Sequence, residues 1–143
     1  MHITSLPGNY GIGTIGKEAF AFVDFLKQTG QSYWQVLPLT PTEVGNSPYQ
    51  SPGVFAGNPN LIYLEDLRDR GLLEDSDLCE IVISDDEETV NYQSIMEWKP
   101  KILKKAFSRF QIDSDYNNFQ AERNYKMITV CLSVQTGGSH CPR

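Results

Sequence analysis

Residues 17–37 read KEAFAFVDFLKQTGQSYWQVL, and this stretch holds the two elements from which the fold class follows. Its first half, Lys17 to Thr29, repeats apolar residues at the three- and four-residue spacing that places them on one face of a helix. Gly30 predicts the end of that helix, because glycine readily adopts the conformation needed at a helix C-terminus. The second half, Tyr33 to Leu37, is aromatic and β-branched, and this composition predicts a buried strand ending at Pro38.

Another strand is predicted ahead of this helix. Residues 2–6 are partly apolar and run into the turn signal Pro7-Gly8, as a strand end does. Strand, helix and strand in so short a space form a βαβ unit, which has a parallel sheet and a right-handed crossover. The predicted fold class is therefore α/β.

Downstream, the pattern is less regular. Residues 61–64 predict a short strand, followed by a helical turn to Arg70 that Gly71 ends. Residues 73–89 are polar and acidic and show no clear periodicity. Apolar residues then recur at helical spacing from 90 to 110, which predicts a helix that starts or kinks near Pro100.

Composition excludes several classes of function. The chain has 143 residues, a net charge of −6 and no basic patch interleaved with aromatics, so nucleic acid is not an expected partner. No window is apolar enough to span a membrane and no signal segment opens the chain, so a cytoplasmic location is expected. The cysteines Cys79, Cys131 and Cys141 are odd in number and lack metal-ligand spacing, which favours reduced thiols.

The glycine-rich segment 11–16 reads GIGTIG and matches the G-x-G-x-x-G pattern of dinucleotide-binding turns. In such turns backbone amides at a helix N-terminus hold a pyrophosphate. The context differs here, because the glycines should follow directly from an apolar strand, and the run Leu6-Pro7-Gly8-Asn9-Tyr10 intervenes. Gln31 or Ser32 also stands where a ribose-binding acid should follow. A plain glycine-rich turn is the better interpretation, and no cofactor is expected.

A long proline- and glycine-rich loop, residues 39–59, follows the strand predicted at 33–37. Such loops are uncommon unless they serve a function, and the carboxyl ends of parallel strands are where ligands bind in α/β folds. Its segment Asn46-Ser47-Pro48-Tyr49-Gln50-Ser51 combines hydroxyls, amides and an aromatic ring, an inventory that suits a sugar. The composition equally allows a surface turn whose tyrosine packs on the domain.

Three blocks of sequence together resemble the bacterial 4-α-glucanotransferases of glycoside hydrolase family 77. They are HITSLPG with YGIG at 2–13, GQSYWQVLPL at 30–39, and SPYQS with FAGNP at 47–59. The resemblance implies the N-terminal fragment of a (β/α)₈ barrel: the first strand, first helix, second strand and part of an inserted subdomain, within residues 1–125. It implies an enzyme that transfers segments of α-1,4-glucans to glucose or another glucan by a retaining mechanism, without metal or organic cofactor.

The resemblance also implies which residues contact the glucan. Tyr49 lies against the bound sugar in this family, Ser47 lines the same cleft, and Asn46 stands where the family usually has Asp. Val44 and Met96 replace aromatics that form a remote glucan site in some members, so no such site is predicted. The family's catalytic carboxylates would follow Arg143, so no catalytic residue and no metal ligand is assigned. The fragment alone is then expected to be inactive and only marginally stable; the alternative is a non-catalytic glucan-binding or structural fragment.

Residues 126–143 depart from the family pattern after Asn124-Tyr125, where Trp-Leu-x-Asp-Tyr-Ala-Leu-Phe usually follows. Read two bases out of register, codons for Met127 to Leu132 can encode Asp-Tyr-x-Leu-Phe. The hypothesis is that this tail is out-of-frame sequence.

Overall fold

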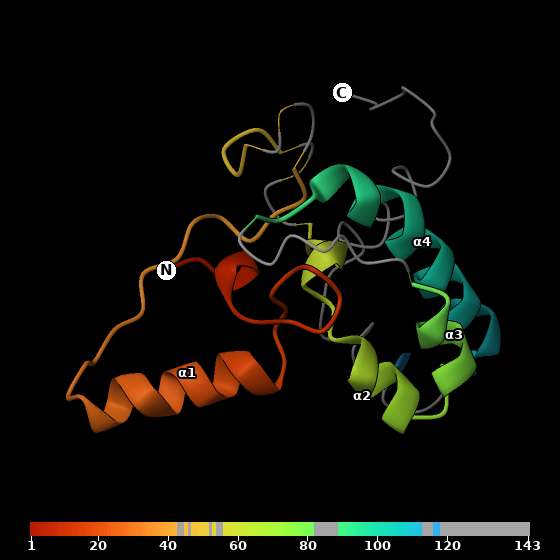
Figure 1. Ribbon diagram of the computed structural model, residues 1–143, viewed down its shortest axis with the longest axis horizontal. Coiled ribbons are helices and arrows are strands. Elements are labelled where there is room, and N and C mark those ends of the chain that lie inside the picture. Colours follow the sequence, from red (N-terminus) through yellow and green to blue (C-terminus); the bar gives the residue numbers. More distant parts are fainter. Residues whose placement is uncertain are drawn as a thin grey trace. The chain divides into compact units, whose positions relative to one another are not determined.

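Helices make up all the regular secondary structure that the computed structural model shows for the described residues: 1–42, 45, 47–51, 53, 56–81, 89–112 and 116–117. In chain order they are the 3₁₀ turn η1 (Ile3–Ser5), α1 (Lys17–Gln28), the 3₁₀ turn η2 (Pro59–Leu61), α2 (Leu64–Asp69), α3 (Asp75–Cys79) and α4 (Tyr92–Arg109) (Figure 1). The chain divides into two compact units. One joins residues 1–39 to 58–110, and the other joins 40–57 to 111–143.

Helix α4 begins at a side-chain cap, because the Asn91 side chain accepts a hydrogen bond of 3.1 Å from the backbone N–H of Ser94. The helix continues through Pro100, so the predicted start at this proline is wrong. Proline removes the hydrogen bond to the carbonyl of Met96, four residues earlier. Both residues are exposed, and water can bond that carbonyl instead.

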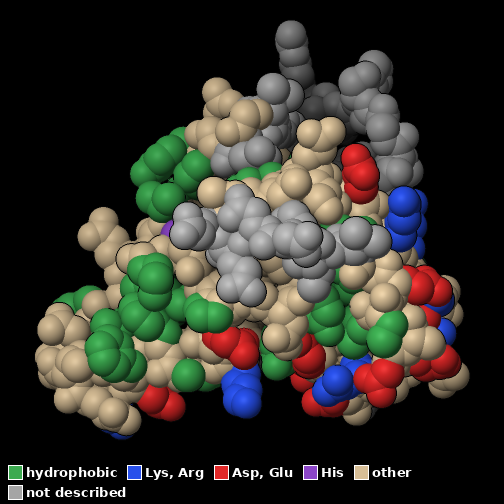
Figure 2. Space-filling view, in the orientation of Figure 1, with side chains coloured by type: hydrophobic (Ala, Val, Ile, Leu, Met, Phe, Trp, Pro, Cys, Tyr) green, Lys and Arg blue, Asp and Glu red, His purple; other side chains and the backbone are tan. Residues whose placement is uncertain are grey.

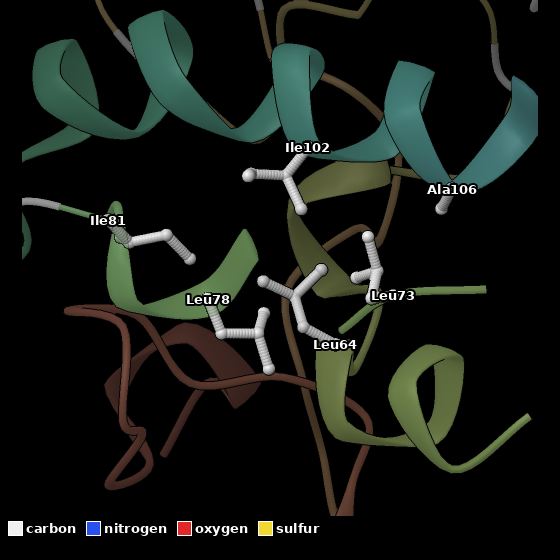
Figure 3. Close-up of a cluster of buried hydrophobic side chains, with 6 residues drawn as sticks. All are labelled: Leu64, Leu73, Leu78, Ile81, Ile102 and Ala106. Carbon is white, nitrogen blue, oxygen red and sulfur yellow. The ribbon is translucent and has the colours of Figure 1, made fainter. Parts of the chain in front are cut away.

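The buried stripe of α4 packs on α2, α3 and the turn between them. Figure 3 shows Ile102 and Ala106 pointing from α4 toward leucines of those elements. The cluster consists of six buried residues: Leu64, Leu73, Leu78, Ile81, Ile102 and Ala106. Each leucine or isoleucine that is fully buried contributes roughly 1.5–3 kcal/mol, so this cluster stabilises the first unit by several kcal/mol.

The α2–α3 connection contains both a predicted and an unpredicted feature. Gly71 ends the turn after α2 with a φ of 74°, as the sequence predicts. Helix α3 lies in the segment where no periodicity was found, and a capping box holds it: the Glu74 side chain accepts from the Asp77 backbone, and Asp77 Oδ2 accepts from Glu74 N at 3.0 Å. The strand predicted over residues 61–64 is wrong, because Leu61 ends η2, Leu64 begins α2 and residues 62–63 connect them.

A second buried cluster lies around η1 and α1. It consists of Ile3, Leu6, Ala19 and Leu61, with Phe22, Trp34 and Val36 packed against it. The Trp34 ring meets Phe22 edge-on at 4.9 Å between centroids, and its Nε1 donates to the Met1 carbonyl at 2.8 Å. On the visible face, hydrophobic side chains gather over α1, whereas charged ones gather over α2 and α3 (Figure 2).

The two strands predicted for a βαβ unit do not form in the described residues. Residues 3–5 form η1, and residues 31–39 have no regular structure. Tyr33 to Leu37 is also not buried: Trp34 and Val36 are half-buried, whereas the residues on either side of them are exposed. The physical reason is that a strand needs a neighbour to pair its backbone groups, and the described part of the chain provides none. The helix predicted from Lys17 is confirmed as α1.

Candidate functional site

The loop at residues 47–51, in the second unit, is built around a hydrogen-bonded turn. The backbone N–H of Gln50 donates to the carbonyl of Ser47 at 3.1 Å. Pro48 occupies the second position of this turn, where its fixed φ favours the fold of the chain. The backbone N–H of Tyr49 also donates to Ser47 Oγ at 3.4 Å. Local sequence therefore holds the backbone of Tyr49 in place from both sides.

Beyond Gln50 the loop closes on itself. The Ser51 hydroxyl donates to the Gly53 carbonyl at 3.1 Å and accepts from the Gly53 amide at 3.3 Å. The same Gly53 carbonyl accepts from the amide of Ala56 at 3.2 Å, and Ala56 is buried. These bonds give the backbone groups of Gly53 and the amide of Ala56 local partners.

Of the three predicted site residues, the structure describes Ser47 and Tyr49. The turn brings Ser47 and Tyr49 together, and the Tyr49 side chain is 75% exposed, so it does not pack down on the domain. Ser47 is half-buried. Asn46 lies outside the described residues, as does Val44. An exposed aromatic ring and a hydroxyl carried by the same turn offer a stacking face and a hydrogen-bonding group to a polar ring-shaped ligand.

The glycine-rich turn at 11–16 packs closely against neighbouring residues. A Cβ on Gly13 would lie 2.1 Å from the Ile3 carbonyl oxygen, and one on Gly16 would lie 2.3 Å from the Tyr63 ring. The amides of Gly13 and Ile15 donate to the carbonyls of Thr4 and Leu61, at 3.0 and 2.9 Å. Since these amides already have partners, the turn does not offer the phosphate cradle of a dinucleotide site, and the structural interpretation holds.

Lys99 is the polar residue that sequence reasoning missed. Its side chain is 1% exposed, and Nζ donates to the carbonyls of Asn60 and Ile62 at 2.7 and 3.0 Å. Burial lowers the pKa of Lys99 to about 8, and the Glu65 carboxylate partly opposes that shift. The signal available in the sequence was its register, since Lys99 lies four residues after Ile95 in the buried stripe of α4.

The buried acids are tied to structural partners. Glu65 accepts from the Asn9 side chain at 2.8 Å. Asp77 pairs with Lys105 and Arg109, and hydrogen bonds from Lys105 and the Glu74 amide hold its pKa well below the usual range. Such an acid stays ionised at neutral pH and cannot act as a general acid.

Neither metal ligation nor a membrane span is indicated by the part of the chain that the structure describes. No group of three or more His, Cys, Asp or Glu side chains there could hold a metal ion. No helix among those residues is long and apolar enough to cross a bilayer.

Comparison with known proteins shows which family the chain belongs to. The sequence profile described as 4-alpha-glucanotransferase, glycoside hydrolase family 77, matches residues 1–132. The chain belongs to the 4-α-glucanotransferase family. This confirms the resemblance carried by the three sequence blocks.

Individual 4-α-glucanotransferases give the extent of the similarity. The chain is 50% identical over 115 residues to the enzyme of Clostridium butyricum, a match covering 80% of this chain and 24% of that protein. It is 49% identical over 113 residues to that of Thermus thermophilus, covering 78% and 21%. The structure resembles the amylomaltase from Streptococcus agalactiae in complex with acarbose, with a TM-score of 0.78 and 44% identity, covering 85% of this chain and 25% of the other. The chain thus spans about a quarter of the length of the curated relatives it matches.

Proposed function

We propose that this chain is part of a 4-α-glucanotransferase, an enzyme that transfers segments of α-1,4-glucans to glucose or another glucan. The observation that carries the proposal is the family match over residues 1–132, since the relatives matched at 41–50% identity bear that name. Similarity to an amylomaltase in complex with acarbose supports a carbohydrate ligand. We expect the protein to work in the cytoplasm without metal or organic cofactor.

Within this proposal the glucan contacts the loop through Tyr49, Ser47 and Asn46. The exposed Tyr49 ring would stack on a sugar face. The Ser47–Gln50 turn would hold the backbone of Tyr49 in position before the glucan binds. The bond that the Ser47 hydroxyl accepts from the Tyr49 amide is long, and a hydroxyl can donate one bond and accept two, so Ser47 could also bond a sugar hydroxyl.

The proposed reaction is a retaining double displacement, which needs a carboxylate nucleophile and a second carboxyl as acid and base. The buried acids Glu65 and Asp77 are poor candidates, because each already has a structural partner and the pKa of Asp77 is lowered. On the strength of the family match, we propose that both catalytic carboxyl groups belong to the part of the family protein that has no counterpart in this sequence. Its own contribution would be substrate binding and orientation, and by itself it would be inactive.

We further propose that residues 2–6 and 33–37 pair as the first and second strands of a (β/α)₈ barrel once the remaining strands are present. The alternation of half-buried Trp34 and Val36 with exposed neighbours supports this, since successive side chains of a strand point to opposite faces. Residues 1–125 would then be the family portion. Residues 126–143 lie outside the described residues, and the profile match extends into them as far as residue 132. We propose that they are out-of-frame sequence; sequencing the encoding DNA and translating all three frames tests this.

The decisive experiment is a chimera in which residues 1–125 of this chain replace the matching part of the Streptococcus agalactiae amylomaltase. We expect the chimera to disproportionate maltotriose. In this background Tyr49→Ala should lower kcat/KM at least roughly tenfold, equivalent to about 1.4 kcal/mol. The control Phe107→Ala removes an exposed aromatic side chain of α4, outside the loop and outside the proposed strands. Equal losses in the two variants would refute the role of Tyr49, and a folded but inactive chimera would refute the proposed activity.

A binding-only function is the second candidate. The observation that favours it is that the buried acids Glu65 and Asp77 are each bonded to a structural partner. Titration of the unmodified chain with maltoheptaose separates the candidates. Binding that Tyr49→Ala abolishes, together with an inactive chimera, would indicate a non-catalytic glucan-binding fragment.

A further inference from the structure

We draw no further inference here: the strongest candidate, the side-chain cluster in which buried Lys99 of α4 holds the carbonyls of Asn60 and Ile62, belongs to the packing of the first unit already described, and a role beyond packing would rest on the lowered pKa of Lys99 alone.

Discussion

Replacing Lys99 with methionine removes a buried charge while keeping the length of the side chain. In the folded protein Nζ of Lys99 bonds two backbone carbonyls, those of Asn60 in η2 and of Ile62 just after it. Methionine can bond neither carbonyl. We expect Lys99→Met to lower the free energy of unfolding at pH 7 by about 2–4 kcal/mol, because two acceptors lose a charge-assisted bond in a buried site.

The pH dependence gives a sharper version of this prediction. The pKa of Lys99 is about 8 in the folded state against an ordinary value of 10.5. Between these values the unfolded chain holds a proton that the folded chain has released, so the contribution of Lys99 to stability rises with pH. Near pH 7 the lysine is charged in both states. The difference in stability between the parent and Lys99→Met should therefore widen, by up to ~3 kcal/mol, from pH 8 to pH 10.5.

The assay is urea unfolding followed by far-ultraviolet circular dichroism at several pH values. Lys101→Met is the matched control, because Lys101 lies in the same helix and is exposed. This control should change the free energy of unfolding by less than about 0.5 kcal/mol at every pH. A difference between parent and Lys99→Met that stays constant or narrows from pH 8 to pH 10.5 would refute the view that burial lowers this pKa.

Two other predictions concern the first unit. Asp77→Asn should lower the melting temperature at pH 7 by at least about 5 °C, whereas the exposed neighbour Asp75→Asn should have little effect. The folded pKa of Asp77 is depressed, so its contribution to stability is present above the unfolded pKa and is lost as pH falls through the folded pKa. Calorimetry should therefore record a smaller difference in melting temperature between the parent and Asp77→Asn at pH 3 than at pH 7. Gly13→Ala should destabilise by about 1–3 kcal/mol in urea melts, since its Cβ would meet the Ile3 carbonyl, and Gly57→Ala, where a Cβ meets nothing within 4 Å, should not.

The chemical groups of the candidate site could be predicted from the sequence, but their exposure could not. The sequence shows that Ser47 and Tyr49 carry groups suited to a sugar, and the position of Pro48 predicts a turn. Whether the tyrosine ring packs inward or faces solvent depends on atoms elsewhere in its unit, and only the structure answers this by leaving the ring exposed. The role of Lys99 was hidden for the same reason, because a lysine in an apolar stripe is buried only if nearby carbonyls can accept from it.

Sequence by itself determined the helices α1 and α4, the stop at Gly71 and the family. A helix pairs its backbone groups within its own segment, so apolar periodicity and local end signals suffice to specify it. The tertiary structure decided the fate of residues 3–5 and 33–37, which were predicted as strands and are not strands here. A strand pairs its backbone with a distant segment, so an apolar, β-branched sequence becomes a strand only where its neighbours are present to accept and donate those hydrogen bonds.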